Sequence, residues 1–266
     1  MSSSIVLLFV AWQDLHSRRF YPVGRLAEIP DPYSETIYEF VYIEGALEAA
    51  AVGFVPFASF PVWDQRYLSS VLFPMFDNRV LSSRRRDYPE FLRLIGLDST
   101  PVGAMQILSR SGGRRATDTL ELFPQPERTP DSGYRTWFWS HGIRHLPVSP
   151  EERIRLLQPG ERLELRTDVC NPVVKDALQI WTSDEVCVGY MPSYLMDEVR
   201  HLGEYSAQCE IYVDRINPEP SPIQQRLLLR MESGWPDGFT PYGYRRYQPI
   251  PIGAVNITEK AVRLKV

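Results

Sequence analysis

The sequence predicts an α+β, β-rich protein: a mixed α/β N-terminal domain, then a small β-barrel with two short helices, then an irregular C-terminal arm. Three observations lead to this class. The 266 residues suit one large domain or two ordinary ones. They include 23 Pro and 16 Gly, which favour short strands and many turns over long helices. Apolar residues make up 44% of the chain, which is enough for packed cores.

The N-terminal domain is expected over residues 1–124. One helix is predicted at 87–96, because Asp87 can cap its start and Gly96 can end it. The first apolar run is too short for a membrane span and follows no basic region, so we expect a first strand and a cytoplasmic protein. Short apolar and β-branched runs predict strands at 4–12, 36–43, 104–109 and 118–123.

The segment 125–135 combines Pro, Gly, Ser and charge, and it is predicted to be a linker. The second domain is expected over 136–216. Its first helix is predicted where Ser149 and Glu152 have the spacing of a capping box, and Gly160 stops it. A second helix is predicted at 192–202, and strands are predicted at 161–167, 177–182 and 209–216. Strands that alternate with two short helices in this way suggest a small β-barrel.

Residues 217–266 are expected to form a C-terminal helix and arm that pack on the domains. Ser221 and Pro222 can open a short amphipathic helix. The stretch that follows is too rich in Pro, Gly and Tyr for regular structure, so it is predicted to be an ordered but irregular arm.

The basic residues are 26 Arg and 3 Lys, and the first Lys is Lys175. This excludes a phosphate-loop, kinase or Schiff-base lysine from the preceding residues. Signature motifs of nucleotide-binding loops, hydrolases and kinases are also absent from the sequence, so we expect neither enzymatic activity nor a cofactor. The net charge is −4, divided as −2 over 1–136, −5 over 137–215 and +3 over 216–266, so any nucleic-acid contact must be local.

Cysteine and histidine patterns do not favour a metal site. Cys170, Cys187 and Cys209 lack CxxC spacing and are predicted to be reduced core thiols. His141 and His145 are four residues apart, but their segment reads as a strand turning into a loop, and no third ligand follows at a suitable spacing. We therefore expect no structural metal.

Three arginine groups are candidates for binding an anion or an acidic partner. Arg114 and Arg115 follow a Gly-Gly turn that could form an anion nest, although a hairpin turn between two strands is favoured. In the C-terminal arm, Arg245 and Arg246 alternate with tyrosines, as on surfaces that stack bases and follow phosphates; the favoured alternative is that the tyrosines anchor the arm. The third group, which precedes the helix at 87–96, consists of Arg84, Arg85 and Arg86. These arginines either bind a phosphate or an acidic partner, or are simply exposed to solvent.

Within 137–216, four pieces of sequence resemble the HIRAN domain family in order and spacing: WFWSHGIRHL, LQPGERLELRTD, NPVVKDALQI and VGYMPSYL. The resemblance implies an OB-like barrel that captures the 3′ end of single-stranded DNA. By matching position, the pocket would contain Arg144 for a phosphate, Asn171 for a sugar hydroxyl or base edge, and His145 and Tyr190 for stacking, with Pro172 beside Asn171. Val173 and Val174 stand where DNA-end-binding members carry an aromatic residue and an acid, so the acid expected to accept the 3′ hydroxyl is missing there.

Residues 1–124 resemble, more distantly, the N-terminal subdomain of HipA-type toxin kinases, through PVGRL, YEFVYIEGA, FPVWDQRYLSSVLFPMF and GLDSTPVGAMQIL. That resemblance implies a surface for a protein partner and no kinase core.

We therefore hypothesise a cytoplasmic, bacterial-type binding protein without catalysis. It is expected to bind nucleic acid, single-stranded DNA ends above all, and no membrane. It is also expected to bind a protein partner, such as a HipA-like kinase, helicase or nuclease encoded nearby. The alternative is a regulatory or antitoxin-like protein of a toxin–antitoxin or phage-defence operon that acts through protein contacts. The aromatic run from Phe54 to Phe76 would then supply partner anchors or, in the plainer interpretation, core packing.

Overall fold

The computed structural model describes residues 5–30, 36–98, 101–148 and 150–253. The chain forms two compact units, and each is assembled from separate stretches. The first unit comprises the residues up to Leu81, residues 103–125 and those from Tyr242 onward. The second unit comprises residues 82–102 and 126–241. Within the described residues, no helix combines the length and apolarity needed to cross a membrane.

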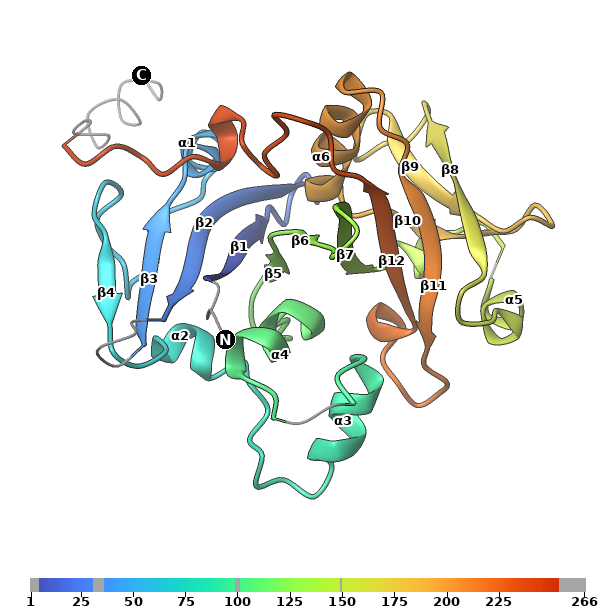
Figure 1. The fold of residues 1–266 in the computed structure, drawn as a ribbon, viewed down its shortest axis with the longest axis horizontal. Coiled ribbons are helices and arrows are strands. Elements are labelled where there is room, and N and C mark those ends of the chain that lie inside the picture. Colours follow the sequence, from blue (N-terminus) through green and yellow to red (C-terminus); the bar gives the residue numbers. More distant parts are fainter. Residues whose placement is uncertain (1–4, 31–35, 99–100, 149, 254–266) are drawn as a thin grey trace. The chain divides into compact units, whose positions relative to one another are not determined.

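The first unit is built on a five-stranded antiparallel sheet in the order β4-β3-β2-β1-β5 (Figure 1). Its core lies on the face that carries Leu8, Leu26 and Phe40, and these side chains pack against the three helices. Strands β1, β3 and β5 carry runs of consecutive buried residues, so the opposite face of the sheet is covered as well. The strands are β1 (Val6–Gln13), β2 (Phe20–Ile29), β3 (Ile37–Tyr42), β4 (Tyr67–Ser69) and β5 (Leu120–Pro124), and the helices are α1 (Gly45–Ala50), α2 (Pro74–Asp77) and α4 (Ala104–Ser111).

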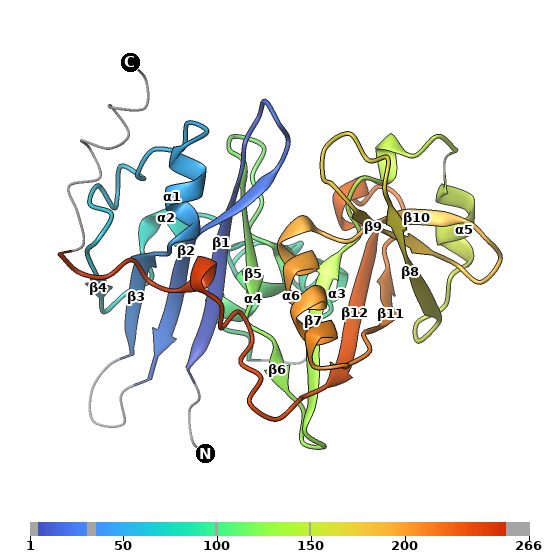
Figure 2. The same ribbon diagram turned by 90° about the horizontal axis from the view of Figure 1, so that it is seen from above.

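The opposite face of this sheet is covered by the C-terminal arm (Figure 2). Tyr242 and Tyr247 are 2% and 1% exposed, and both contact Phe9 of β1 with ring centroids 4.8 and 5.1 Å away. The arm continues along β3, where Ile250 N donates to Tyr42 O over 3.0 Å. A short 3₁₀ helix, η3 (Arg245–Tyr247), lies within it. The tyrosines therefore anchor the arm in this unit.

Three expected strands of the first unit are confirmed as β1, β3 and β5, but residues 104–109 form helix α4 instead of a strand. The Gln106 side chain accepts a hydrogen bond from Gly103 N at the start of this helix, and Gly112 adopts the left-handed conformation at its end. Met105 and Leu108 are buried three residues apart, which is helical spacing. The Gly-Gly segment consequently connects a helix to a strand and is not a hairpin turn between two strands.

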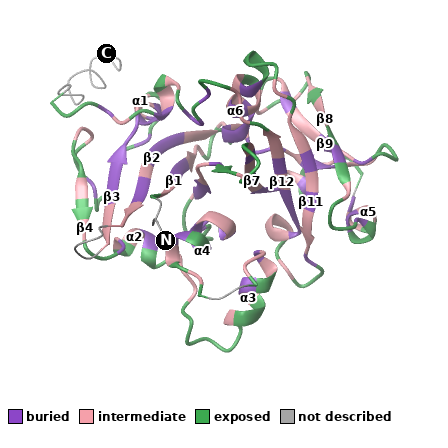
Figure 3. Ribbon diagram, in the orientation of Figure 1, coloured by how far each residue is buried: buried purple, intermediate pink, exposed green. Residues whose placement is uncertain are grey.

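The second unit holds a seven-stranded antiparallel sheet in the order β10-β9-β8-β11-β12-β7-β6 (Figure 1). Its central strands carry the buried side chains, as the purple segments of β11 and β12 show (Figure 3). The strands are β6 (Glu127–Arg128), β7 (Gly133–Trp139), β8 (Arg162–Asp168), β9 (Ala177–Trp181), β10 (Cys187–Tyr190), β11 (Glu210–Ile216) and β12 (Leu227–Gly234). The helices are α3 (Tyr88–Leu94), η1 (Ile143–His145), α5 (Glu151–Leu156), α6 (Ser193–Glu204) and η2 (Ile223–Gln225).

The α+β class is confirmed, but the expected barrel is not closed by a full ladder of strands. Instead, an isolated bridge joins the residue pair His141 and Tyr190, through two backbone hydrogen bonds of 2.9 and 2.8 Å. The strand β10 is only four residues long, and its register with β9 shifts between Cys187 and Gly189. A short, irregular strand cannot extend the pairing further.

Several segments of the second unit differ from the sequence-based expectation. Residues 125–135 contain β6 and the start of β7, so the expected linker is a hairpin. The helix expected after Ser221 is only the 3₁₀ turn η2, and β12 follows, because its leucines pair between β11 and β7 and are buried on both sides. Helix α3, expected in the N-terminal domain, belongs to the second unit.

The helices expected near 150–160 and 192–202 are confirmed as α5 and α6, and the strands at 161–167, 177–182 and 209–216 as β8, β9 and β11. Helix α5 ends at Leu156, however, so Gly160 does not stop it. Ser149 lies outside the described residues. Asp87 precedes α3 as expected, but its carboxylate binds Arg85 over 2.8 and 2.9 Å instead of capping the helix. The three cysteines are free, and Cys170 is exposed rather than in a core, because it lies in the loop after β8.

Candidate nucleic-acid interface

Asp168, the last residue of β8, is the centre of a polar cluster in the second unit. Its Oδ2 accepts a hydrogen bond from the Tyr190 hydroxyl over 3.1 Å and from Asn171 Nδ2 over 3.3 Å, and Gln179 Nε2 lies 3.5 Å away. Its Oδ1 accepts from Cys170 N over 3.1 Å. Gln179 Nε2 also donates to the Tyr190 hydroxyl over 3.2 Å. This half-buried carboxylate at the end of β8 thus gathers four donors, two from the strands β9 and β10 and two from the loop after β8.

Strand alternation places these side chains together. In the β8–β9 pairing, Arg166 lies opposite Gln179 and Asp168 opposite Ala177, and Gln179 in turn lies opposite Tyr190 of β10. Side chains of paired residues project from the same face of a sheet. The polar face of β8, β9 and β10 therefore contains the cluster, while alternate residues such as Leu163 and Ile180 are buried beneath it.

Two glycines allow β10 and the Tyr190 ring to approach the segment from Ser140 to Gly142 closely. A Cβ on Gly142 would lie 2.9 Å from Tyr190 Cδ2, and Gly142 has a φ of +70°. Gly189 has a φ of +137°, and a Cβ there would lie 1.9 Å from Ser140 Oγ. These positions exclude side chains for both steric and conformational reasons. Burial raises the pKa of the Tyr190 hydroxyl, and Asp168 adds to the shift, so Tyr190 remains a neutral donor at neutral pH.

Asn171 is committed to the geometry of its own loop. Its Oδ1 accepts hydrogen bonds from the backbone N of Val173 and of Val174, both over 3.0 Å, while its Nδ2 faces Asp168. This is an Asx-type turn, which holds the loop without help from a strand. The sequence has Val173 and Val174 directly after the Asn-Pro pair and its next acid only at Asp176, but the fold supplies the carboxylate of Asp168 from three residues before Asn171.

Arg144 and His145 lie on η1, which packs beside β10. Both are exposed, and neither side chain has a hydrogen-bond or ion-pair partner among the residues that the structure describes. Pro172 is likewise exposed, at the tip of the Asn171 loop. The structure thus brings Arg144, His145, Asn171 and Tyr190 to one region of the second unit, where η1, β10 and the loop after β8 meet.

Other residues of this region were missed by sequence reasoning. Arg166 lies over the Trp181 ring, with its guanidinium carbon 4.9 Å from the ring centroid, and it is held by Glu164 and Glu185 at 2.9 and 2.5 Å. Arg200 of α6 reaches Asp176 O over 3.5 Å and is half exposed. Strand alternation in ERLELRTD could have indicated Asp168 and Arg166 as neighbours on one face, whereas Arg200 carries no such signal.

The remaining arginine candidates lie on other elements of the chain. Arg245 and Arg246 belong to the first unit, where they pair with Glu44 over 3.3 Å and Glu48 over 3.0 Å. With Tyr242 and Tyr247 buried, the arm does not offer a surface of stacked tyrosines and free arginines. This outcome matches the anchoring alternative.

The Gly-Gly segment does not form an anion nest, because its amides are already used. Gly112 N donates to Leu108 O over 3.0 Å and Gly113 N to Ser111 Oγ over 3.1 Å. Arg114 pairs with the buried Glu121 over 3.3 Å, and Arg115 is exposed nearby.

Arg84, Arg85 and Arg86 form an exposed turn before α3, in which Arg85 is paired with Asp87. The described residues contain no group of three or more acids, histidines and cysteines able to hold a metal. The aromatic run from Phe54 to Phe76 packs mainly into the first unit's core, where Phe54, Phe60 and Phe76 are 0–5% exposed.

Comparison with known proteins finds no matching family model and no matching curated protein. Two crystal structures are similar to part of the chain. One is of a protein from Lactobacillus plantarum, with 17% sequence identity and a TM-score of 0.30 over 37% of this chain and 96% of that one. The other is of the HIRAN domain of human HLTF, with 15% identity and a TM-score of 0.26 over 40% of this chain and 79% of that one.

Proposed function

We propose that the second unit binds single-stranded nucleic acid without catalysis, and that it holds the 3′ end of a DNA strand at the Asp168 cluster. The observation that carries this proposal is the carboxylate of Asp168 placed between Tyr190 and Asn171, with the exposed Arg144 on η1, which packs beside β10. A carboxylate accepts a hydrogen bond from a sugar hydroxyl but repels a phosphate at the same place. The site therefore suits a strand end with a free hydroxyl.

Each group has a role in this arrangement. The terminal 3′ hydroxyl donates to Asp168, in place of or beside the Tyr190 hydroxyl. The Tyr190 and His145 rings offer surfaces for stacking the last base, a contact worth about 1–3 kcal/mol per base. Arg144 pairs with the preceding phosphate, which orients the strand without reading its sequence. Arg166, whose charge is offset by Glu164 and Glu185, contributes little attraction for phosphate.

The decisive experiment measures fluorescence anisotropy of a short labelled DNA with a 3′ hydroxyl and of the same strand with a 3′ phosphate. We expect tighter binding of the hydroxyl end, and loss of that preference in Asp168→Asn. Glu164→Gln is the matched control, since it removes an equal charge four residues away on the same strand face. Equal binding of the two ends by the wild-type protein would overturn end recognition, and absence of any binding would overturn nucleic-acid binding.

For the first unit we propose binding of a protein partner. Exposed apolar side chains gather between residues 52 and 71: Val52, Val55, Val62, Leu68 and Val71, with exposed fractions from 43% to 70%. Leu68 lies on β4, an edge strand of the sheet. Exposed apolar groups of this kind mark interaction surfaces when they lie close together.

The partner proposal is tested by co-purification from the native host with Leu68→Glu and Val71→Glu. Loss of a stoichiometric protein in these variants, but not in Leu15→Glu elsewhere on the unit, would support it. No stoichiometric partner with the wild-type chain would contradict it. A partner that binds while the DNA assay is negative would favour the regulatory alternative.

A further inference from the structure

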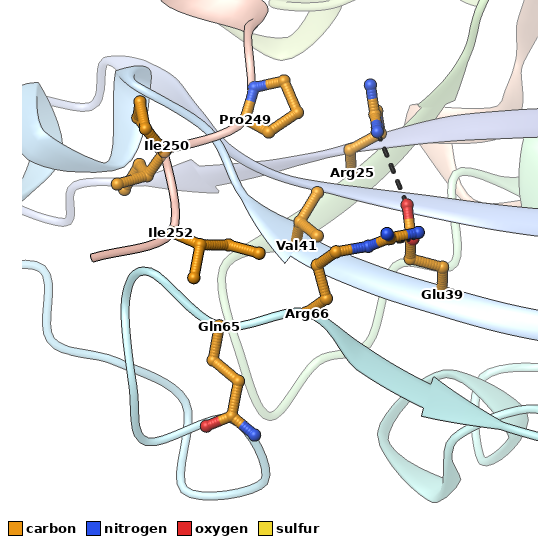
Figure 4. Close-up of a pocket in the computed structure, with 9 residues that line it drawn as sticks. Arg25, Glu39, Val41, Gln65, Arg66, Pro249, Ile250 and Ile252 are labelled. Carbon is orange, nitrogen blue, oxygen red and sulfur yellow. Dashed lines mark hydrogen bonds and ion pairs between the residues drawn. The ribbon is translucent and has the colours of Figure 1, made fainter. Parts of the chain in front are cut away.

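A groove on the first unit lies between β3, the segment before β4 and the C-terminal arm (Figure 4). Arg25 of β2 and Glu39 of β3 lie side by side in it, and Arg66 reaches Glu39 from the other side. Val41, Ile250 and Ile252 supply the apolar wall. The groove therefore combines a charged end with an apolar end.

The charged end carries one more positive than negative charge. Glu39 is 4% exposed; it accepts a hydrogen bond from Arg66 Nε over 2.7 Å, and Arg25 Nη2 lies 3.5 Å from its other oxygen. Arg25 Nε is buried and has no hydrogen-bond partner among the described residues. The Arg66 side chain is 56% exposed. Two guanidinium groups that share one carboxylate retain N–H donors and a net charge of about +1.

We propose that this groove binds a small carboxylate with a branched apolar group, either a free acid or the last residue of a polypeptide. The carboxylate of the ligand would bind the two guanidinium groups beside Glu39. Two positive and two negative charges would then balance, and the N–H donors that Glu39 does not use would have an acceptor. The branched group then packs against Ile250 and Ile252. Ile252 is 73% exposed without such a ligand.

The size of the groove supports a small ligand. Its volume of about 210 Å³ is below the roughly 300–1,000 Å³ of pockets for drug-sized molecules. One net positive charge matches a single carboxylate better than a doubly charged phosphate. Apart from Gln65, the remaining walls are Val, Pro and Ile side chains, so the ligand is mainly apolar beyond its acid group.

Calorimetric titration of the full chain tests this with two acids, 3-methylbutanoate and N-acetylvaline, and with their primary amides. We expect the acids to bind at least about tenfold more tightly than the amides, because only a charged acceptor satisfies both arginines. Tighter binding of 3-methylbutanoate would identify a free acid as the ligand, and tighter binding of N-acetylvaline a chain end. Equal binding of acids and amides, or no binding of either acid at millimolar concentration, would overturn the proposal.

Two variants distinguish recognition from structural support. Arg66→Met removes one guanidinium and should weaken acid binding by about tenfold, while Glu39→Gln removes the competing carboxylate and should strengthen it. Arg18→Met, an exposed arginine of the same unit, is the charge-matched control. If Arg66→Met does not fold, Arg66→Lys retains the charge without the planar fork and should show an intermediate loss. Unchanged binding in a folded Arg66 variant would overturn the assignment.

Discussion

The Tyr190 hydroxyl donates a hydrogen bond to Asp168 Oδ2 over 3.1 Å, and this bond joins the last residue of β10 to the last residue of β8 across β9. The same hydroxyl accepts from Gln179 over 3.2 Å. A bound sugar hydroxyl would compete for the same carboxylate oxygen. The observed function of the Tyr190 hydroxyl as a donor and the proposed function of its ring as a stacking surface can therefore be separated by substitution.

Tyr190→Phe removes the donor and keeps the ring, whereas Tyr190→Ala removes both. We expect Tyr190→Phe to lower the free energy of unfolding by about 1 kcal/mol and to leave affinity for a 3′-hydroxyl DNA end nearly unchanged, because the ligand takes the vacated acceptor. Tyr190→Ala should weaken that affinity by about 1–3 kcal/mol. Anisotropy titrations of both variants check this, and equal losses would contradict the separation.

Gly142→Ala should destabilise the second unit by more than a change of glycine conformation alone. The new Cβ would lie 2.9 Å from the Tyr190 ring, in addition to the strain of φ +70°. Together these should lower the free energy of unfolding by about 2–3 kcal/mol. Gly160→Ala is the matched control, since its φ is +87° but no atom lies within 4 Å, so about 1 kcal/mol is expected. Urea denaturation measures both, and equal losses would show that the ring contact is unimportant.

Salt dependence should be shallow if DNA binds at the proposed site. Arg144 and Lys175 are exposed and unpaired among the described residues of this region. With about two phosphates neutralised, the logarithm of the association constant should fall with the logarithm of salt concentration with a slope of about −1.4. Arg144→Met should reduce the steepness by about 0.7. A slope several times steeper would indicate a different, more basic surface.

The cysteines should differ widely in reactivity. Burial raises the pKa of the Cys209 thiol to about 11, so at pH 8 about one molecule in 1,000 carries the thiolate that reacts with alkylating agents. Burial also raises the pKa of Cys187, whereas Cys170 is exposed. Iodoacetamide should label Cys170 first and Cys209 only after unfolding, as mass spectrometry of the digested protein would show. Early labelling of Cys209 would contradict the placement of β11.

The first unit should lose stability in alkali. Burial, with a 3.0 Å hydrogen bond to Glu28, raises the pKa of Tyr38 to about 12, and burial raises that of Tyr42 further. A raised pKa in the folded state means that the stabilising contribution is fully present below the unfolded value near 10 and is lost as the pH rises from about 10 through 12. Tyr38→Phe should flatten this decline in urea titrations between pH 9 and 12. An unchanged decline would assign it to other groups.

Much of the fold could be predicted from local pattern. Regular alternation in 161–167 and 209–216, and the Pro and Gly signals around 150–160, indicate elements that the structure contains. The pattern fails where tertiary contacts decide between helix and strand. The segment RLLLRM suits either, and it becomes β12 because two neighbouring strands are available on its edges. Residues 104–109 form helix α4 because buried residues such as Met105 and Leu108 have helical spacing and lie on one side of the helix.

The candidate site shows the same division. Tyr190, Asn171 and Arg144 could be named from motif spacing. Asp168 could not be assigned a role in this way, because its partners Gln179 and Tyr190 are 11 and 22 residues away in sequence and meet it only through strand register. Arg245 and Arg246 have the composition of a nucleic-acid surface, and their long-range pairing with Glu44 and Glu48 could not be predicted from the sequence.

The discontinuous make-up of the two units has a consequence for the order of assembly during synthesis. Phe9 and Phe123 emerge early from the ribosome, but the tyrosines that cover them come from residues 242–247, after every residue of the second unit has been made. Domains usually fold in the order in which they are translated. Here the unit that begins first is the one completed last. Until then one face of its sheet stays uncovered, and a nascent chain paused near residue 241 would be the species most in need of a chaperone.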